Sequence, residues 1–104
     1  MVVRLNSPET MIETRLNKYL NKDETGLRKS ILKFFLNGES FTTQDIFELL
    51  KKEGFDVNYR GISATVGLMN TRLGILRVDV KGDRNIYTLK DEYKNTLKTI
   101  MANY

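Results

Sequence analysis

Apolar residues recur at helical spacing in five stretches of the chain, and in two further stretches they alternate with polar residues. A repeat of three to four residues is typical of a helix with one buried face, and a repeat of two is typical of a half-buried strand. The pattern therefore predicts an α+β protein, mainly α with a small antiparallel β-hairpin. The predicted helices cover about 8–21, 27–35, 43–53, 59–73 and 91–102, and the predicted strands cover 75–80 and 85–89.

The apolar positions of these repeats form the predicted core. In each helix they fall on one stripe, and in the hairpin they fall on the side that faces the helices. The core positions are Met11, Ile12, Leu16, Tyr19, Leu20, Leu27, Ile31, Phe34, Phe35, Ile46, Leu49, Leu50, Ile62, Val66, Met69, Leu73, Leu76, Val78, Val80, Tyr87, Leu89, Tyr93, Leu97, Ile100 and Met101.

The clearest local signal lies between Phe41 and Ile46. With Thr42 as the N-cap, Asp45 falls at the third helical position, where the two residues can exchange capping hydrogen bonds. Phe41 and Ile46 fall at the two positions of a hydrophobic staple. This segment therefore predicts a helix that begins at Thr43.

Other helix ends carry weaker signals. Ser7 is the expected cap of the first helix, ahead of a proline at the first helical position, and Asn58 is the expected cap of the fourth helix. Gly54 and Gly74 end the third and fourth helices. Between those helices, Asp56-Val57 is long enough only for a bridge at a sheet edge. Asp91-Glu92 is expected to open the last helix.

The composition fits one domain over residues 1–104, with a central part at about 25–90 and an added helix on each side. The chain has no cysteine and no histidine, which excludes disulfides, thiolate metal sites and the commonest general base. Its acidic residues form no paired catalytic set. We therefore expect no enzyme activity, no cofactor and no metal.

No apolar run approaches the roughly 20 residues that cross a membrane, and the N-terminus lacks a signal peptide. The sequence predicts a soluble, cytoplasmic protein with no membrane association. The net charge of +4 is concentrated in residues 55–90, which hold six basic and three acidic side chains. A positive surface there would attract phosphates, although a basic isoelectric point is also common in small proteins.

The fourth predicted helix leaves one face free of apolar core positions. Opposite Ile62, this face holds Arg60, Ala64, Gly67, Leu68 and Thr71, with Ser63 at its edge. Its small residues would permit close approach to a DNA groove, and an arginine can pair with a guanine edge. The same face could instead be a solvated surface or a protein contact.

The hairpin tip is a second candidate. Lys81, Arg84 and Asn85 surround a Gly-Asp turn, where cations could reach DNA phosphates or simply protect the sheet edge. Thr43 and Gln44, at the start of the third helix, could also anchor a phosphate, although Thr42 is better explained as a cap.

A resemblance to a known superfamily rests on residues 63–89. Residues 63–66 read Ser-Ala-Thr-Val, residues 73–76 read Leu-Gly-Ile-Leu, and Tyr87 and Leu89 follow in the returning strand. This pattern resembles the recognition helix and wing of winged-helix transcriptional regulators. More narrowly, the chain resembles a small archaeal winged-helix family of unassigned function.

The resemblance implies a winged helix-turn-helix that binds double-stranded DNA and regulates transcription. Its recognition helix would enter the major groove and its wing would lie along the backbone. The expected DNA-binding residues are Thr43, Gln44, Tyr59, Arg60, Ser63, Ala64, Thr71, Arg72, Lys81, Arg84 and Asn85.

One departure from the superfamily pattern supports an alternative function, which is binding to a protein and not to DNA. Gly67 and Leu68 stand where many such regulators carry aromatic or basic residues, so Ala64, Gly67 and Leu68 could dock another protein. The added helices, 8–21 and 91–102, carry apolar stripes that could form a homodimer or close over the chain's own core.

Overall fold

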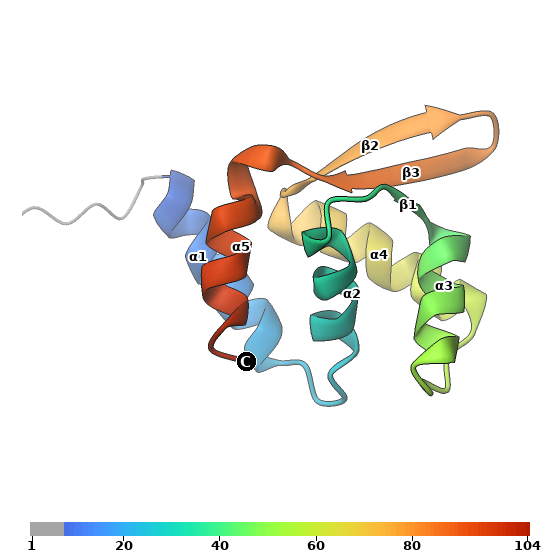
Figure 1. Ribbon diagram of the computed structural model, residues 1–104, viewed down its shortest axis with the longest axis horizontal. Coiled ribbons are helices and arrows are strands. Elements are labelled where there is room, and N and C mark those ends of the chain that lie inside the picture. Colours follow the sequence, from blue (N-terminus) through green and yellow to red (C-terminus); the bar gives the residue numbers. More distant parts are fainter. Residues whose placement is uncertain (1–7) are drawn as a thin grey trace, which may run out of the picture.

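The computed structural model describes residues 8–104 and arranges them as five α-helices, one 3-10 helix and a small sheet (Figure 1). This confirms the predicted α+β class. The elements, in chain order, are α1 (Pro8–Asn21), α2 (Leu27–Leu36), β1 (Phe41–Thr42), α3 (Thr43–Lys52), α4 (Tyr59–Leu73), β2 (Leu76–Lys81), β3 (Arg84–Leu89), η1 (Asp91–Tyr93) and α5 (Lys94–Met101).

The sheet is antiparallel with strand order β1-β3-β2. Strands β2 and β3 form the predicted hairpin around Gly82, whose φ of 64° is readily adopted only by glycine. The third strand was not predicted: Phe41 pairs with Tyr87, and Thr42 pairs with Ile86. The backbone of Thr42 is extended, so this residue serves both as a strand residue and as a helix cap.

Asp56-Val57, which the sequence allowed at most a sheet-edge bridge, forms none. Both residues lie in the irregular loop between α3 and α4, and the edge position next to β3 is occupied by β1. The physical reason is that the chain enters α3 in an extended conformation beside β3, which leaves the later segment no free edge of that strand to pair with.

The capping box of α3 is confirmed. The Asp45 N–H donates to Thr42 Oγ1 at 3.1 Å, and the Thr42 N–H donates to Asp45 Oδ2 at 2.9 Å. At the other end, the Phe55 N–H donates to the Leu50 carbonyl at 3.1 Å, and Gly54 has a φ of 92°. This is the pattern by which a left-handed glycine closes a helix.

Helix α4 also follows the prediction. Asn58 Oδ1 accepts the Gly61 N–H at 2.7 Å, and Gly74, with a φ of 67°, ends the helix. The four predicted core positions of this helix are all buried, namely Ile62, Val66, Met69 and Leu73.

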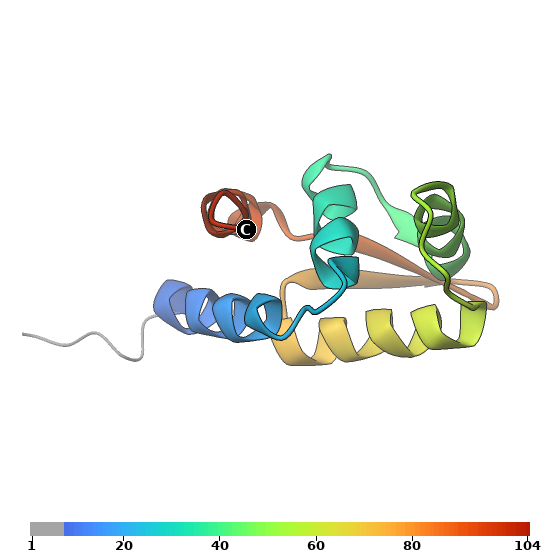
Figure 2. The same cartoon turned by 90° about the horizontal axis from the view of Figure 1, so that it is seen from below.

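The added helices pack against the rest of the chain. Helices α1 and α5 lie side by side (Figure 1), and α1 also contacts α4, with which it shares one side of the molecule (Figure 2). Leu16 of α1 and Leu97 of α5 are fully buried. The Tyr104 hydroxyl bonds Asn17 Oδ1 at 3.0 Å and Asn21 Oδ1 at 2.9 Å. The apolar stripes therefore close over the chain's own core, and the homodimer stays a prediction.

Four details of the predicted core and helix ends need correction or comment. Val80 is 70% exposed because it lies near the hairpin tip, beyond the reach of β1, and Met11 is 40% exposed on the side of α1 that faces solvent. The segment Asp91–Tyr93 forms a 3-10 turn, so α5 begins only at Lys94. The predicted Ser7 cap lies outside the described residues.

No helix within residues 8–104 has both the length and the apolar character needed to cross a membrane.

Candidate nucleic-acid interface

The face of α4 that is opposite its buried stripe is open to solvent. Arg60, Ala64 and Thr71 are exposed on it, as predicted, and Leu68 is 51% exposed. The Thr71 hydroxyl donates to the Gly67 carbonyl at 3.1 Å, so its proton is used within the helix. This central strip of α4 therefore offers one strong donor, Arg60, among small side chains.

A hollow of about 550 Å³ lies along one flank of this strip. Its walls come from the start of α3, the start of α4 and the tip of the β2–β3 hairpin, and we call it the hairpin hollow. It brings together six of the eleven predicted residues. These are Thr43, Gln44, Tyr59, Ser63, Arg84 and Asn85.

The hairpin hollow is polar but carries little positive charge. Arg84 is the single cation among its lining residues, and the carboxylates of Asp45 and Asp83 line it as well. Asp45 is also the partner of Thr42 in the cap of α3. Gln44 Nε2 donates to Glu48 Oε1 at 3.3 Å. The hollow thus supplies hydrogen-bonding groups more than electrostatic attraction.

The remaining predicted residues lie around this hollow or away from it. Lys81 pairs with Arg84 across the hairpin tip and is exposed. Thr43 is only 9% exposed, which leaves it little surface for a ligand. Arg72 lies on the opposite flank of α4, so the structure separates it from the hairpin residues with which the sequence had grouped it.

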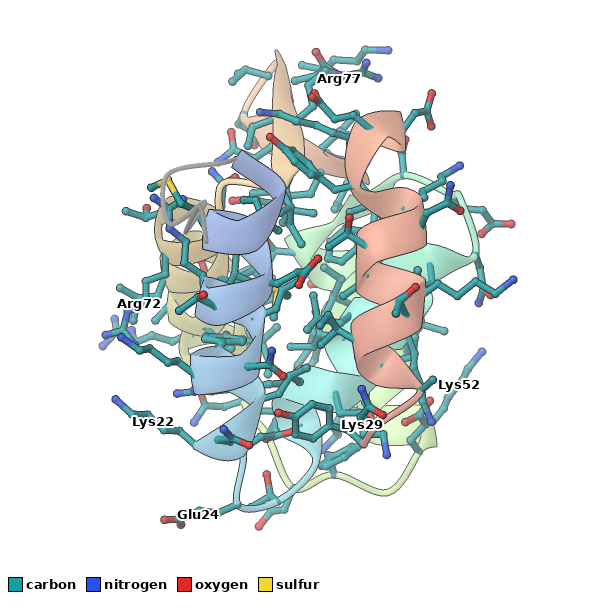
Figure 3. The ribbon with its side chains drawn as sticks, turned by 90° about the vertical axis from the view of Figure 1, so that its left-hand side faces the viewer. Lys22, Glu24, Lys29, Lys52, Arg72 and Arg77 are labelled. Atoms are coloured by element: carbon teal, nitrogen blue, oxygen red, sulfur yellow. The ribbon has the colours of Figure 1, made fainter. Side chains whose placement is uncertain are left out.

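On that opposite flank, five cationic side chains surround Tyr19. They line a small hollow of about 180 Å³ whose lining includes no acidic side chain. In Figure 3, Lys22, which directly follows α1, and Arg72 of α4 extend to the same side of the molecule. We call this group the basic cluster, and its members are Arg15, Lys18, Lys22, Arg28 and Arg72.

Arg28 holds the most fixed position in the basic cluster. Its guanidinium carbon lies 4.2 Å from the centre of the Tyr19 ring, and its Nη1 donates to the Tyr19 carbonyl at 2.9 Å. Burial raises the pKa of the Tyr19 hydroxyl, the charges of Arg28 and Arg72 lower it in part, and the Asp23 carboxylate raises it slightly. These electrostatic effects reflect two cations held close to one partly desolvated ring.

Ion pairs do not neutralise the basic cluster. Among the side chains that the structure describes, those of residues 11–104, the salt bridges are Arg77–Asp79 and Lys94–Asp91, neither of which includes a member of the cluster. No group of three or more acidic side chains suited to a metal ion occurs in the same part of the chain. The arrangement is therefore suited to binding anions.

Sequence reasoning found only Arg72 of this cluster. The other four were missed because residues 1–24 hold equal numbers of basic and acidic side chains, so a count by segment sums to zero. A signal was present, because Arg15, Lys18 and Lys22 recur at intervals of three and four residues. That spacing puts them on one side of a helix, with Glu13 on the other.

Comparison with known proteins identifies the family. The chain matches the family described as "Protein of unknown function (DUF2551)" over residues 16–97, and it belongs to that family. It is also similar to a protein from Archaeoglobus fulgidus described as "Uncharacterized protein", with 42% identity over 93 residues. That match covers 89% of this chain and 95% of the relative.

Proposed function

We propose that this member of the DUF2551 family is a winged helix-turn-helix protein that binds double-stranded DNA as a transcriptional regulator. The order of α2, β1, α3, α4 and the β2–β3 hairpin, with sheet order β1-β3-β2, supports the fold proposal. In this proposal α4 is the recognition helix and the hairpin is the wing.

The observation that carries the proposal is the position of the exposed strip of α4 between two flanks of different chemistry. Tyr59 and Ser63 face the hairpin hollow on one flank, while Leu68 and Arg72 face the other. A major groove is about 12 Å wide and is bounded by a phosphate backbone on each side. A helix lying in the groove therefore needs a bare central strip with polar groups along its flanks.

Gly67 adds independent support for a close partner. It lies in the middle of α4, and a Cβ at this position would meet no atom within 4 Å. Glycine inside a helix costs about 1 kcal/mol relative to alanine, and nothing in the packing of this chain requires it. A surface that must approach the helix backbone closely would account for it.

In this proposal the predicted residues divide between base and backbone contacts. Arg60 would pair with a base edge, and Lys81, Arg84 and Asn85 would contact phosphates from the wing. Gln44 would donate to a phosphate near the start of α3.

The first experiment is to titrate the protein into random-sequence duplex DNA at two salt concentrations, following fluorescence anisotropy. We expect binding that weakens steeply with salt, because each phosphate contact releases counterions. Absence of binding at low salt would contradict the proposal.

Arg84→Ala tests the wing. The slope of log K against log salt should become shallower by about one unit, uniformly across sequences. Lys98→Ala is the matched control, because it removes one exposed charge from α5, away from the hairpin. An unchanged slope in Arg84→Ala would remove the wing from the interface.

Exposure of Leu68 favours a second candidate, a protein-interaction module that uses Ala64, Gly67 and Leu68. Leu68→Lys should abolish binding to a protein partner, whereas it should leave DNA affinity intact or raise it by adding a cation. Loss of DNA binding in Leu68→Lys would instead assign Leu68 to the DNA contact.

The proposed regulator acts as a homodimer, which would match a two-fold symmetric DNA site. Because the apolar stripes of α1 and α5 are buried within the chain, the pairing would use the outer faces of these helices. Sedimentation equilibrium measures this directly, and a monomer at all accessible concentrations would contradict it.

A further inference from the structure

We infer that the basic cluster is a second phosphate-binding site, which holds the DNA strand on the opposite side of α4 from the wing. This inference rests on the proposed DNA binding and extends it to residues of α1 and α2. Its members come from three helices that are separate in sequence and converge at one end of α4.

The number of cations exceeds what the fold itself can use. Lys18 lies in the last turn of α1 and Arg72 lies in the last turn of α4, and Arg15 lies beside Gly74 at the end of α4. A helix end carries roughly half a negative charge, so two ends account for about one of the five cations. The helix ends therefore leave most of the positive charge of the cluster available to bind an anionic ligand.

Nearby carboxylates do not neutralise the remaining positive charge of the basic cluster. Asp23 accepts the backbone N–H groups of Arg28 and Lys29 at 3.1 and 3.0 Å, so it is engaged at the start of α2. Glu24 lies on the loop beside it and is exposed to solvent. Both line a neighbouring hollow of about 300 Å³, but neither lines the hollow that the five cations share.

The cluster is continuous with the proposed recognition surface. The neighbouring hollow is lined by Thr65, Leu68 and Arg72 of α4 together with Lys22 and Arg28. These α4 residues lie on the flank opposite Tyr59 and Ser63. A helix seated in the major groove would therefore present the wing to one backbone and the basic cluster to the other.

The cluster suits a row of phosphates better than one small anion. Lys18 of α1 and Lys22, directly after α1, are exposed, while Arg28 is held against Tyr19, so the charges are spread along a surface instead of enclosing a point. Arg28 is pre-ordered by its ring and carbonyl contacts, which reduces the entropy lost on binding.

The test compares two double variants that each remove two lysine charges. Lys18→Ala/Lys22→Ala alters the cluster, and Lys51→Ala/Lys52→Ala alters the exposed end of α3; Figure 3 shows Lys22 and Lys52 on opposite sides of the molecule. All four positions are exposed and helical or adjacent to a helix end, so alanine should preserve the fold. Thermal unfolding of both variants verifies this. Arg28 is left intact because it contacts Tyr19.

For binding to duplex DNA, the cluster variant should show a salt slope shallower by about 1.8 units than the wild type. Between 50 and 200 mM salt the wild type should then lose about tenfold more affinity than the variant. The control variant should keep the wild-type slope. Lys18→Glu/Lys22→Glu, which reverses the charges, should weaken binding further.

The outcomes separate this inference from the proposed function. If the wild type binds DNA and the two double variants behave alike, the second phosphate site is wrong while DNA binding stands. If the wild type does not bind DNA, both are wrong. A further measurement adds inorganic pyrophosphate to the DNA complex at constant ionic strength. It should displace DNA equally from the wild type and from the cluster variant. Selective displacement would assign the cluster to a free anion.

Discussion

The two flanks of α4 differ in charge and in the way the chain builds them. The hairpin hollow contains one cation and two carboxylates among its lining residues, whereas the basic cluster contains five cations and no carboxylate. The hollow is built from three segments, residues 42–45, 59–63 and 83–87, all within the predicted central part of the chain at about 25–90. The cluster requires α1 to pack beside α4, because its members extend from Arg15 to Arg72. Positive charge on this protein therefore depends on tertiary packing more than on local composition.

The largest expected effect comes from loosening α1. Leu16 is fully buried between α1 and the rest of the core, so Leu16→Ala should lower the free energy of unfolding by about 2–5 kcal/mol. Urea unfolding measures this. Met11→Ala, at a position that is 40% exposed on the same helix, should stay within about 0.5 kcal/mol of the wild type. Equal costs would mean that α1 is not firmly packed and that the basic flank is not a fixed surface.

Arg60→Ala examines the strip between the two flanks. If Arg60 makes a paired contact to a guanine, its loss should cost about 1–3 kcal/mol at one base pair and relax the preference there. Affinity for a set of single-base variants of a selected site measures this. Lys51→Ala should leave the preference unchanged, and a uniform loss with Arg60→Ala would make this residue a phosphate contact.

Gly67→Ala separates stability from binding. The added methyl group meets no neighbour within 4 Å, so helix propensity should raise the free energy of unfolding by about 0.5–1 kcal/mol. DNA affinity should fall if the groove floor approaches the helix backbone. Asn95→Ala at an exposed α5 position should leave affinity unchanged. An unchanged affinity in Gly67→Ala would show that the partner stays away from the centre of α4.

The smallest effect concerns Tyr19, on the basic flank. Burial raises its pKa above 10.0, so the folded protein holds this proton more tightly than the unfolded chain. That contribution to stability is complete below the unfolded pKa and is lost as pH rises through the folded pKa. As pH rises above about 10 the wild type should lose stability more steeply than Tyr19→Phe. If the free energy of unfolding depended on pH in the same way in both proteins, burial would not raise the pKa of Tyr19.

The sequence predicted those parts of the molecule that depend on neighbouring residues. The exchange of hydrogen bonds between Thr42 and Asp45 and the closure at Gly74 need only a few adjacent positions, and both are confirmed. Strand β1 was missed because two residues carry no periodicity, and its pairing depends on β3, more than 40 residues later. Val80 was placed in the core because alternation along a strand says nothing about where the covering layer ends.

The candidate site also has parts that the sequence predicted and a part that it did not. The exposed strip of α4 follows from helical spacing alone, and six residues of the hairpin hollow were predicted from a helix start, a hairpin tip and the resemblance to winged-helix regulators. The basic cluster was not, because the contact of α1 with the C-terminal end of α4 is a result of three-dimensional packing. Only Arg72, which lies on the predicted recognition helix, was identified beforehand.

The packing of α1 against α5 also has a consequence for how the chain folds during synthesis. Helix α1 leaves the ribosome first, but Leu97 and its neighbours on α5, which cover it, follow about 80 residues later. At about 5–20 residues per second, α1 waits roughly 4–16 s for this partner. During that interval the other helices that contact α1, namely α2 and α4, are the available cover for its apolar stripe. The basic flank would thus reach its final form after the hairpin flank, when the last helix docks.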